Sequence, residues 1–194
     1  MPSARVFFSV AFPVAALATL AGCSDPPPPA PEAAWTINLQ PSAADSSLCR
    51  LGDGHAAGIG KISENKRDQL LSNGIDGAEI TCSVIGDKTF KVAADAAQGD
   101  AHITIDINQI AATATAEMPA TGTLSYASDK TARSQYTALA DKPCQFYFVP
   151  DSGEGVSPGT IWFAFRCPTV VDASTASTCQ ISQGYASFAN CLAQ

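Results

Sequence analysis

The sequence has few of the residues that form most catalytic and metal sites. Its 194 residues include two histidines, His55 and His102, and neither lies near a cysteine. No two cysteines have the C-x-x-C spacing that is typical of thiol redox sites and zinc knuckles. The G-x-S-x-G motif of α/β hydrolases is also absent. These absences argue against thiol chemistry, structural zinc and hydrolysis by a serine triad.

Basic residues are scarce as well. The chain has 11 Lys and Arg against 18 Asp and Glu, which gives a formal net charge of −7, and the basic residues form no cluster. An acidic surface of this kind repels phosphate backbones and anionic lipids. We therefore expect no nucleic-acid partner.

Only one long apolar run is present, over residues 6–22. Arg5 precedes it and small residues end it, and these are the parts of an export signal. The run has 17 residues, contains Pro13, and is followed by Asp25 and a proline cluster instead of basic residues. These features argue against a helix that stays in the membrane. We expect an exported protein.

The apolar run ends in Leu20, Ala21, Gly22 and Cys23, and this motif resembles the lipobox of bacterial lipoproteins. The resemblance implies that diacylglycerol is thioether-linked to Cys23, that the chain is cut before it, and that the new amine is usually acylated. Two or three acyl chains hold a protein on a bilayer almost irreversibly. Ser24 after the cysteine resembles the pattern that directs such proteins to the outer membrane. An ordinary signal peptide with a chance cysteine is the alternative.

The chain divides into three parts. Residues 1–22 are the expected lipoprotein signal peptide. Residues 23–34 contain the lipidated cysteine and the segment SDPPPPAPE, whose prolines favour an extended polyproline II tether. A proline-rich ligand for a partner's aromatic groove is the alternative for this segment. Residues 35–194 are long enough for a single domain with its own core, and we see no second domain.

Six cysteines remain once Cys23 is assigned to lipid: Cys49, Cys82, Cys144, Cys167, Cys179 and Cys191. An even number in an oxidising compartment predicts three disulfides. Cys144 and Cys167 come at the two ends of an expected hairpin, so we pair them. Cys179 and Cys191 end a shorter segment of the same kind, which leaves Cys49 for Cys82. The sequence alone does not fix this connectivity.

The body has short segments with apolar residues at alternate positions, separated by turn residues, and no long amphipathic helix. We expect strands over residues 78–85, 89–95, 101–107 and 122–128. The alternation is cleanest in the third of these. There Ala101, Ile103, Ile105 and Ile107 would face a core, while His102, Thr104 and Asp106 would face water.

Two later segments have the pattern of hairpins. Aromatic-rich residues 144–150 and 160–167 flank a loop that contains Gly and Pro. Residues 178–191 repeat this scheme on a smaller scale, with a turn expected near Gln183 and Gly184.

Residues 61–74 suit either a helix ending at Asn73 and Gly74 or extended structure before a turn, and we favour the extended form with at most one helical turn. Together these patterns predict an all-β fold. We expect an antiparallel β-sandwich or a strongly bent barrel, with disulfides and little helix.

Several short motifs match known chemistry but lack the partners that it needs. Ser63 and Lys66 fit the S-x-x-K pattern, but the S-D-N and K-T-G motifs of penicillin-recognising enzymes are absent. His55 or His102 would have to be the base of a catalytic triad, and we assign both to the surface. We therefore predict no catalytic residues.

Metal and ligand sites are only weakly indicated. A metal could use Asp53 with His55, or Asp100, His102 and Asp106 together on one side of a strand. Calcium could use the loop at 151–155, although that loop is also a natural hairpin tip and a natural place for a binding surface. Trp162, Phe146, Phe148, Phe163 and Phe165 could stack on carbohydrate where they project outward, and core packing is expected for most of them. We predict no metal and no cofactor.

These observations predict a lipid-anchored lipoprotein of the cell envelope, in the outer membrane more than the inner. Its β-domain would be non-catalytic, with a structural or binding role. The expected partners are the bilayer, through acylated Cys23, and an envelope protein or a glycan. A small envelope hydrolase or carbohydrate-active enzyme is the alternative. The closing FANC segment resembles that of uncharacterised β-rich envelope lipoproteins and implies no activity.

Overall fold

The structure is a computed structural model that describes residues 26–42, 48–51 and 54–193. The predictions for the signal peptide, for lipidated Cys23 and for Asp53 fall outside these ranges. Within them, no helix is long and apolar enough to cross a bilayer.

The described chain is built almost entirely from β-strands, as predicted. The strands are β1 (Glu32–Pro41), β2 (His55–Ile59), β3 (Lys61–Ile62), β4 (Arg67–Gln69), β5 (Leu71–Ser72), β6 (Ala78–Gly86), β7 (Thr89–Gln98), β8 (Ala101–Ala111), β9 (Ala120–Ala127), β10 (Tyr136–Ala138), β11 (Cys144–Tyr147), β12 (Gly155–Ser157), β13 (Thr160–Asp172) and β14 (Ser177–Ala189). A short 3-10 helix, η2 (Asp129–Thr131), follows β9.

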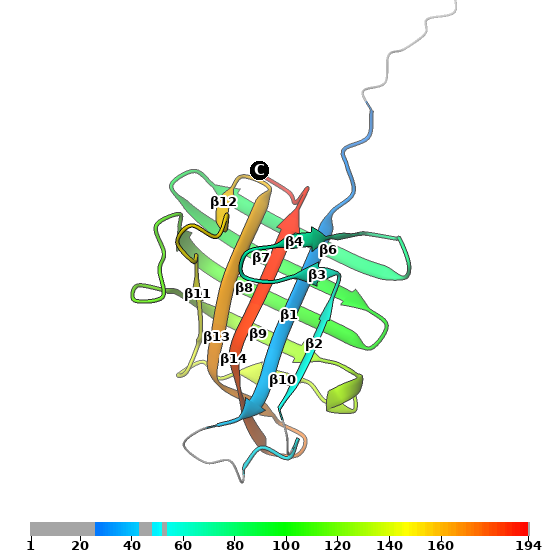
Figure 1. Cartoon of the computed structure of the whole chain (residues 1–194), viewed down its shortest axis with the longest axis vertical. Coiled ribbons are helices and arrows are strands. Elements are labelled where there is room, and N and C mark those ends of the chain that lie inside the picture. The colour runs from blue at the N-terminus through cyan, green and yellow to red at the C-terminus, as the bar shows by residue number, and fades with distance from the viewer. Residues whose placement is uncertain (1–25, 43–47, 52–53, 194) are drawn as a thin grey trace, which may run out of the picture.

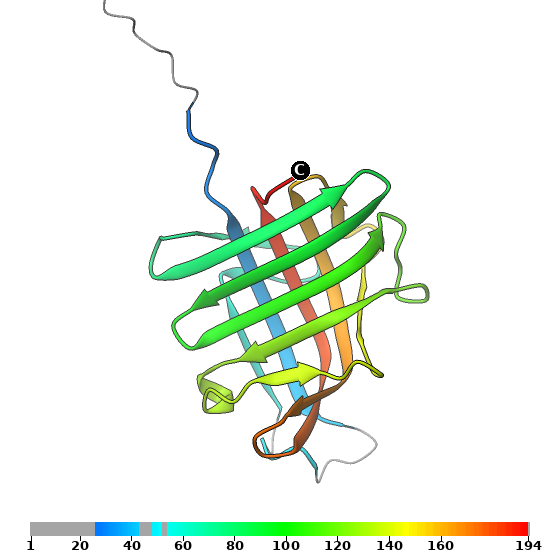
Figure 2. The same ribbon diagram turned by 180° about the vertical axis from the view of Figure 1, so that it is seen from behind.

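Most strands belong to one continuous antiparallel sheet in the order β2-β1-β14-β13-β10-β9-β8-β7-β6. The sheet folds over on itself at β10 and β11, each of which pairs with both β13 and β9. The first layer, β2-β1-β14-β13, thereby crosses the second layer, β9-β8-β7-β6, at a steep angle (Figures 1 and 2). The two packed layers match the predicted β-sandwich, and the strong bend of the single sheet matches the predicted bent barrel.

The core lies between the two layers and follows the predicted alternation. In β8, Ile103, Ile105 and Ile107 are fully buried, whereas Asp106 is exposed. From the first layer, the Trp35 indole packs edge-on against Tyr126, with ring centroids 5.9 Å apart. Burial of this apolar surface is the main favourable term in folding such a sheet.

The chain end covers the edge of the second layer. Val84 N–H donates to the Leu192 carbonyl at 2.8 Å, and Leu192 N–H donates to the Cys82 carbonyl at 3.0 Å. The disulfide between Cys82 and Cys191 fixes this contact. An edge strand that would otherwise offer unpaired backbone groups is thus partly closed off.

The six cysteines of the described residues all form disulfides, but two of the predicted pairs are wrong. The pairs are Cys49–Cys179, Cys82–Cys191 and Cys144–Cys167, and only the last was predicted. The predicted turn at Gln183 and Gly184 is also wrong, because β14 is one continuous strand. Its 13 residues span roughly 40 Å, so the cysteines near its two ends cannot meet.

A β-bulge and a close contact explain the sequence near the expected turn. The pairing with β1 shifts between Asn38 and Leu39, opposite residues 181–183. At Gly184 a Cβ would lie 2.3 Å from the Phe165 ring, so only glycine fits. The sequence pattern assigned Gly184 to a turn. In the structure, Gly184 instead lies next to a β-bulge and packs closely against a ring within a continuous strand.

Residues 61–74 are extended, as we favoured. β3 and β4 pair as a small separate hairpin, and β5 then pairs with β1 before a tight turn leads into β6. Contacts of β3 with β1 and β14 place this hairpin on the outer face of the first layer (Figure 1).

Candidate functional site

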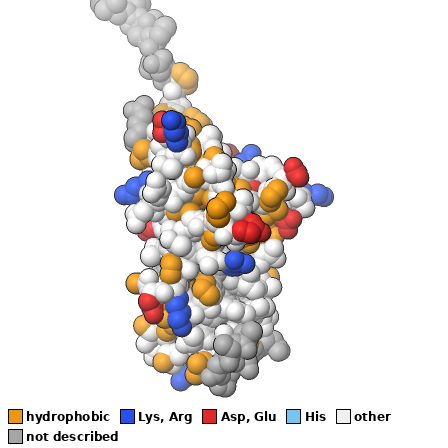
Figure 3. All heavy atoms as spheres, turned by 90° about the vertical axis from the view of Figure 1, so that its left-hand side faces the viewer, with side chains coloured by type: hydrophobic (Ala, Val, Ile, Leu, Met, Phe, Trp, Pro, Cys, Tyr) orange, Lys and Arg blue, Asp and Glu red, His pale blue; other side chains and the backbone are white. Residues whose placement is uncertain are grey.

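Two segments cover the outer face of the first layer and leave a pocket between them. One is the β3–β4 hairpin, and the other is the segment of residues 149–157, which includes β12. The pocket has a volume of about 280 Å³ and is lined by Arg67, Gly153, Gly155, Val156, Ser157, Thr160 and Trp162. We call it the Trp162 groove. Figure 3 shows the β11–β12 side of the molecule, where hydrophobic side chains are interspersed with acidic and basic ones.

The floor of the groove comes from β13 and its neighbours. Because side chains alternate along a strand, Phe163 and Phe165 enter the core while Trp162 and Ala164 point outward. Trp162 lies opposite Ser187 of β14 on one side and Gly155 of β12 on the other. Of the five aromatic residues considered for a stacking platform, only Trp162 is not buried.

The next row along the same face adds two tyrosines. Ala164 lies opposite Tyr147 of β11 and Tyr185 of β14, so its small side chain separates the two rings. Tyr185 is buried and its hydroxyl donates to Glu64 Oε2 at 3.1 Å. Burial and this hydrogen bond raise the pKa of Tyr185. Burial also raises the pKa of Tyr147, although the Arg166 guanidinium, 5.8 Å from its ring centroid, lowers it.

Arg67 forms the wall on the hairpin side. Its guanidinium carbon lies 5.7 Å from the centroid of the Trp162 ring, within the range of a cation–π interaction. Its Nη1 donates to Ser187 Oγ at 3.3 Å. Opposite-strand pairing and this cation–π contact therefore both fix Trp162 at the centre of the groove.

Glu154 lies between Gly153 and Gly155, which line the other side of the groove, but it is not itself a lining residue. Val149 N–H donates to Glu154 Oε2 at 2.7 Å, which ties the carboxyl to its own loop. Burial raises the pKa of Glu154 to about 7, and the Glu64 carboxylate adds to this, although the N–H groups of Val149 and Ala164 lower it. Near neutral pH this carboxyl is therefore divided between its protonated and ionised forms.

Two polar atoms in this region are buried without a hydrogen-bond partner among the described residues: Trp162 Nε1, which belongs to a lining residue, and Glu154 Oε1, which does not. One is an acceptor when ionised and the other is a donor. Leaving such atoms unpaired is costly, and exceptions of this kind call for a functional explanation.

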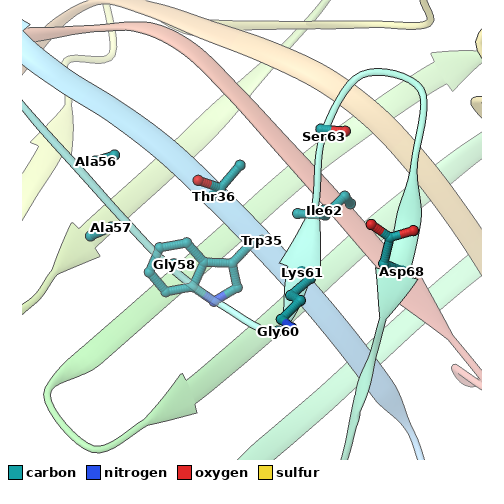
Figure 4. Close-up of a pocket in the computed structure, with 10 residues that line it drawn as sticks. All are labelled: Trp35, Thr36, Ala56, Ala57, Gly58, Gly60, Lys61, Ile62, Ser63 and Asp68. Atoms are coloured by element: carbon teal, nitrogen blue, oxygen red, sulfur yellow. The ribbon is translucent and has the colours of Figure 1, made fainter.

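A second depression lies on the other side of the β3–β4 hairpin. Its volume is about 390 Å³, and Figure 4 shows Lys61, Ser63 and Asp68 of the hairpin facing Thr36 of β1 and the small residues of β2. Neither Lys61 nor Asp68 forms an ion pair within the described chain. None of the described residues that line this depression has a buried polar side-chain atom without a partner, so it is the weaker candidate.

The histidine sites predicted from sequence do not assemble. His102 Nε2 lies 2.8 Å from Asp95 Oδ2 and 3.4 Å from Thr104 Oγ1, on the outer face of the second layer. Both partners thus approach the same ring nitrogen, whereas a catalytic triad uses both nitrogens. Asp100 instead pairs with Arg133 at 3.0 Å, and Asp106 is exposed. No three His, Cys, Asp or Glu side chains of the described chain gather where they could hold a metal.

His55 has a structural contact. Its Nε2 lies 3.1 Å from the Tyr126 hydroxyl, which lies 2.6 Å from buried Ser128 Oγ. Burial lowers the pKa of His55 and raises that of Tyr126 to about 12. This chain of hydrogen bonds joins the edge strand β2 to β9.

The S-x-x-K motif does not form an active site either. Ser63 N–H donates to the Lys66 carbonyl at 2.8 Å, so the two residues close the β3–β4 turn and are not on a helix. The loop at 151–155, by contrast, forms part of the groove wall. Sequence reasoning named it as a place for a binding surface.

Sequence reasoning missed Arg67, which forms the hairpin side of the groove, and its surroundings Glu64, Tyr147 and Tyr185. One signal was available. Residues 163–165 and 184–188 are buried on both faces of their strands, and their outward positions carry small or aromatic residues, such as Ala164 and Tyr185. Such a break in alternation indicates that another segment covers the outer face.

Comparison with protein-family models, with curated proteins and with solved structures finds no match to this chain. Its function therefore has to be inferred from its own side chains.

Proposed function

We propose that the protein is a lipid-anchored lipoprotein of the cell envelope whose β-domain is non-catalytic and binds a ligand in the Trp162 groove. The lipobox-like motif ending at Cys23 supports the anchor, and Ser24 supports the outer membrane as its location. The proline-rich segment would hold the domain away from the bilayer.

The observation that carries the binding role is the groove itself. It combines an outward-pointing indole, an arginine held against that indole, and a buried indole N–H without a partner among the described residues. Sites for small ligands typically combine an aromatic surface with a few convergent polar groups in this way.

A small envelope hydrolase is the second candidate, and Glu154 favours it. A carboxyl with a pKa of about 7 beside a second carboxylate, Glu64, is the arrangement of a general acid. Against this, the Glu154 carboxyl is bound by the Val149 N–H, and its Oε1 atom is buried. A general acid has to reach the atom that it protonates, so we favour binding without catalysis.

The anchor is tested by the Cys23→Ala variant in the native host. The variant should move from the membrane to the soluble fraction and lose the label after growth with a clickable palmitate analogue. Cys23→Ala protein that stays with the membrane would contradict the lipid anchor.

Catalysis is tested by incubating the full protein with purified cell-wall glycan and measuring new reducing ends. We expect no release above the background of heat-inactivated protein. Release that disappears in Glu154→Gln would support the hydrolase instead.

A further inference from the structure

Building on this proposed function, we propose that the ligand of the Trp162 groove is an uncharged carbohydrate, with one pyranose ring seated against Trp162 and Arg67. The groove volume of about 280 Å³ is just below the roughly 300–1,000 Å³ of typical small-molecule sites. It suits one sugar ring of a chain whose neighbouring rings extend into solvent. It is too small for a packed peptide segment.

The residues that line the groove match both the apolar C–H faces and the hydroxyl groups of a sugar. A pyranose ring has C–H groups that pack on an aromatic face, and Trp162 is the half-buried aromatic residue that points into the groove. Its hydroxyl groups need donors and acceptors around the rim. Arg67 supplies guanidinium donors, and Ser157 and Thr160 supply hydroxyls that both donate and accept.

The net charge of the chain disfavours anionic ligands. Arg67 forms no ion pair with any carboxylate of the described residues, so its remaining N–H donors are free to bind ligand oxygens. The chain as a whole carries a formal net charge of −7, and this overall field repels phosphate, sulfate and uronic acids. An uncharged ligand with hydroxyl groups meets no such repulsion and can accept hydrogen bonds from Arg67.

The Trp162 indole adds a polar group that a hydroxyl can satisfy. Trp162 Nε1 is a donor without an acceptor among the described residues. A sugar hydroxyl can accept this hydrogen bond, whereas a hydrocarbon ligand cannot.

The test is a titration of the full lipoprotein in detergent micelles with cellotetraose, with chitotetraose and, as an anionic comparison, with tetragalacturonate. The chain has two tryptophans, and Trp35 is fully buried in the core, so a change in tryptophan fluorescence reports on Trp162. Isothermal titration calorimetry gives the dissociation constants of variants that lack the indole.

We expect at least one neutral tetrasaccharide to bind and tetragalacturonate not to bind. Trp162→Ala and Arg67→Ala should each raise the dissociation constant about tenfold or more. Trp162→Phe should retain part of the affinity. Lys61→Ala, in the neighbouring depression of Figure 4, is the matched control and should leave it unchanged. Melting curves of all variants establish that they are folded, and Arg67→Ala serves alone if Trp162→Ala does not fold.

Binding that survives both Trp162→Ala and Arg67→Ala, or that is lost in Lys61→Ala, would overturn the assignment to this groove. Preference for tetragalacturonate, or no binding of either neutral sugar, would overturn the ligand class. These results leave the anchor and the absence of catalysis untouched, since fractionation and the reducing-end assay test those separately. Cleavage of a bound tetrasaccharide would overturn the non-catalytic function while supporting the carbohydrate assignment.

Discussion

The outer faces of the two layers differ although the layers belong to one sheet. On the second layer, β6 alternates strictly between buried and exposed residues, and Asp95, His102 and Thr104 form a half-exposed polar cluster. On the first layer, alternation fails along β13 and β14, because the β3–β4 hairpin and residues 149–157 lie over them. The bare face carries polar groups that satisfy one another. The covered face carries the buried indole N–H of the Trp162 groove, which has no partner among the described residues.

This difference shows where a small β-domain can hold a ligand. A flat sheet face exposes its side chains to water, which solvates and screens their charges. A covered face desolvates the same kinds of groups and raises the pKa of Glu154 to about 7. The predictions below test this contrast.

Among the variants that test this contrast, the largest effect should come from breaking the disulfide that ties the second layer to the end of the first. The Cys82–Cys191 disulfide closes 109 residues, whereas Cys144–Cys167 closes 23. In the chain-entropy picture, Cys82→Ala with Cys191→Ala costs about 5 kcal/mol, and Cys144→Ala with Cys167→Ala about 3 kcal/mol. Urea unfolding of both double variants measures this. An equal or larger loss for the second pair would show that the two layers do not depend on the first bond.

The packing inside the first layer gives the next effect. Gly184→Ala places a Cβ against the Phe165 ring, which is itself held by Phe146 and Phe163. We expect a loss of about 1–3 kcal/mol in urea unfolding, because the core must move to accept it. Gly155→Ala is the matched control, since nothing lies within 4 Å of its added Cβ. If the two variants were equally stable, the packing at Gly184 would be looser than the structure indicates.

The pH dependence of stability separates the covered face from an ordinary surface. The folded-state pKa of Glu154, about 7, lies above the ordinary value of 4.5, so the folded protein binds this proton more tightly than the unfolded chain. The stability that this proton contributes is therefore present below about pH 4.5 and is lost as the pH rises to about 7, above which the loss is complete. The amide introduced in the Glu154→Gln variant cannot ionise, so the melting temperature of the variant should rise relative to that of the wild type over this pH range. Parallel melting profiles from pH 4 to 8 would contradict a desolvated carboxyl.

The smallest effect belongs to the bare face. The Asp95–His102 pair is 2.8 Å apart, but its two side chains are 43% and 39% exposed. Exposed pairs contribute about 0–1 kcal/mol, so Asp95→Asn should lower the unfolding free energy by less than about 1 kcal/mol. A loss of several kcal/mol in urea unfolding would mean that the polar cluster strongly stabilises the second layer. This result would contradict the view that the polar groups of this outer face contribute little.

Local patterns predicted local structure well. The alternation at residues 101–107 gave the buried isoleucines of β8, and the two aromatic segments gave the β11–β13 pairing with its Cys144–Cys167 disulfide. Both are short-range features, in which the period of the side chains and the length of the loop decide the result. The same reasoning failed at a glycine that could mark either a turn or close packing within a strand. Gly184 was assigned to a turn because the sequence does not contain the position of the Phe165 ring.

The groove shows the limit more clearly. Sequence reasoning singled out Trp162 and the loop at 151–155, but nothing in the sequence connected them with Arg67, which lies far away along the chain. Their meeting depends on a hairpin folding back over β14 and a loop folding back over β13. The periodicity of apolar residues does not show where a distant segment will lie over a strand. Small residues at outward positions are a local sign that such a position is covered.

By itself, then, the sequence determined the all-β class, the antiparallel strands with their inward faces, and the formation of three disulfides, because periodicity and cysteine number are properties of the chain. Tertiary structure alone decided the long-range disulfide pairs and the groove. Both depend on which distant segments lie side by side, and that is set by the packing of the whole sheet around its core.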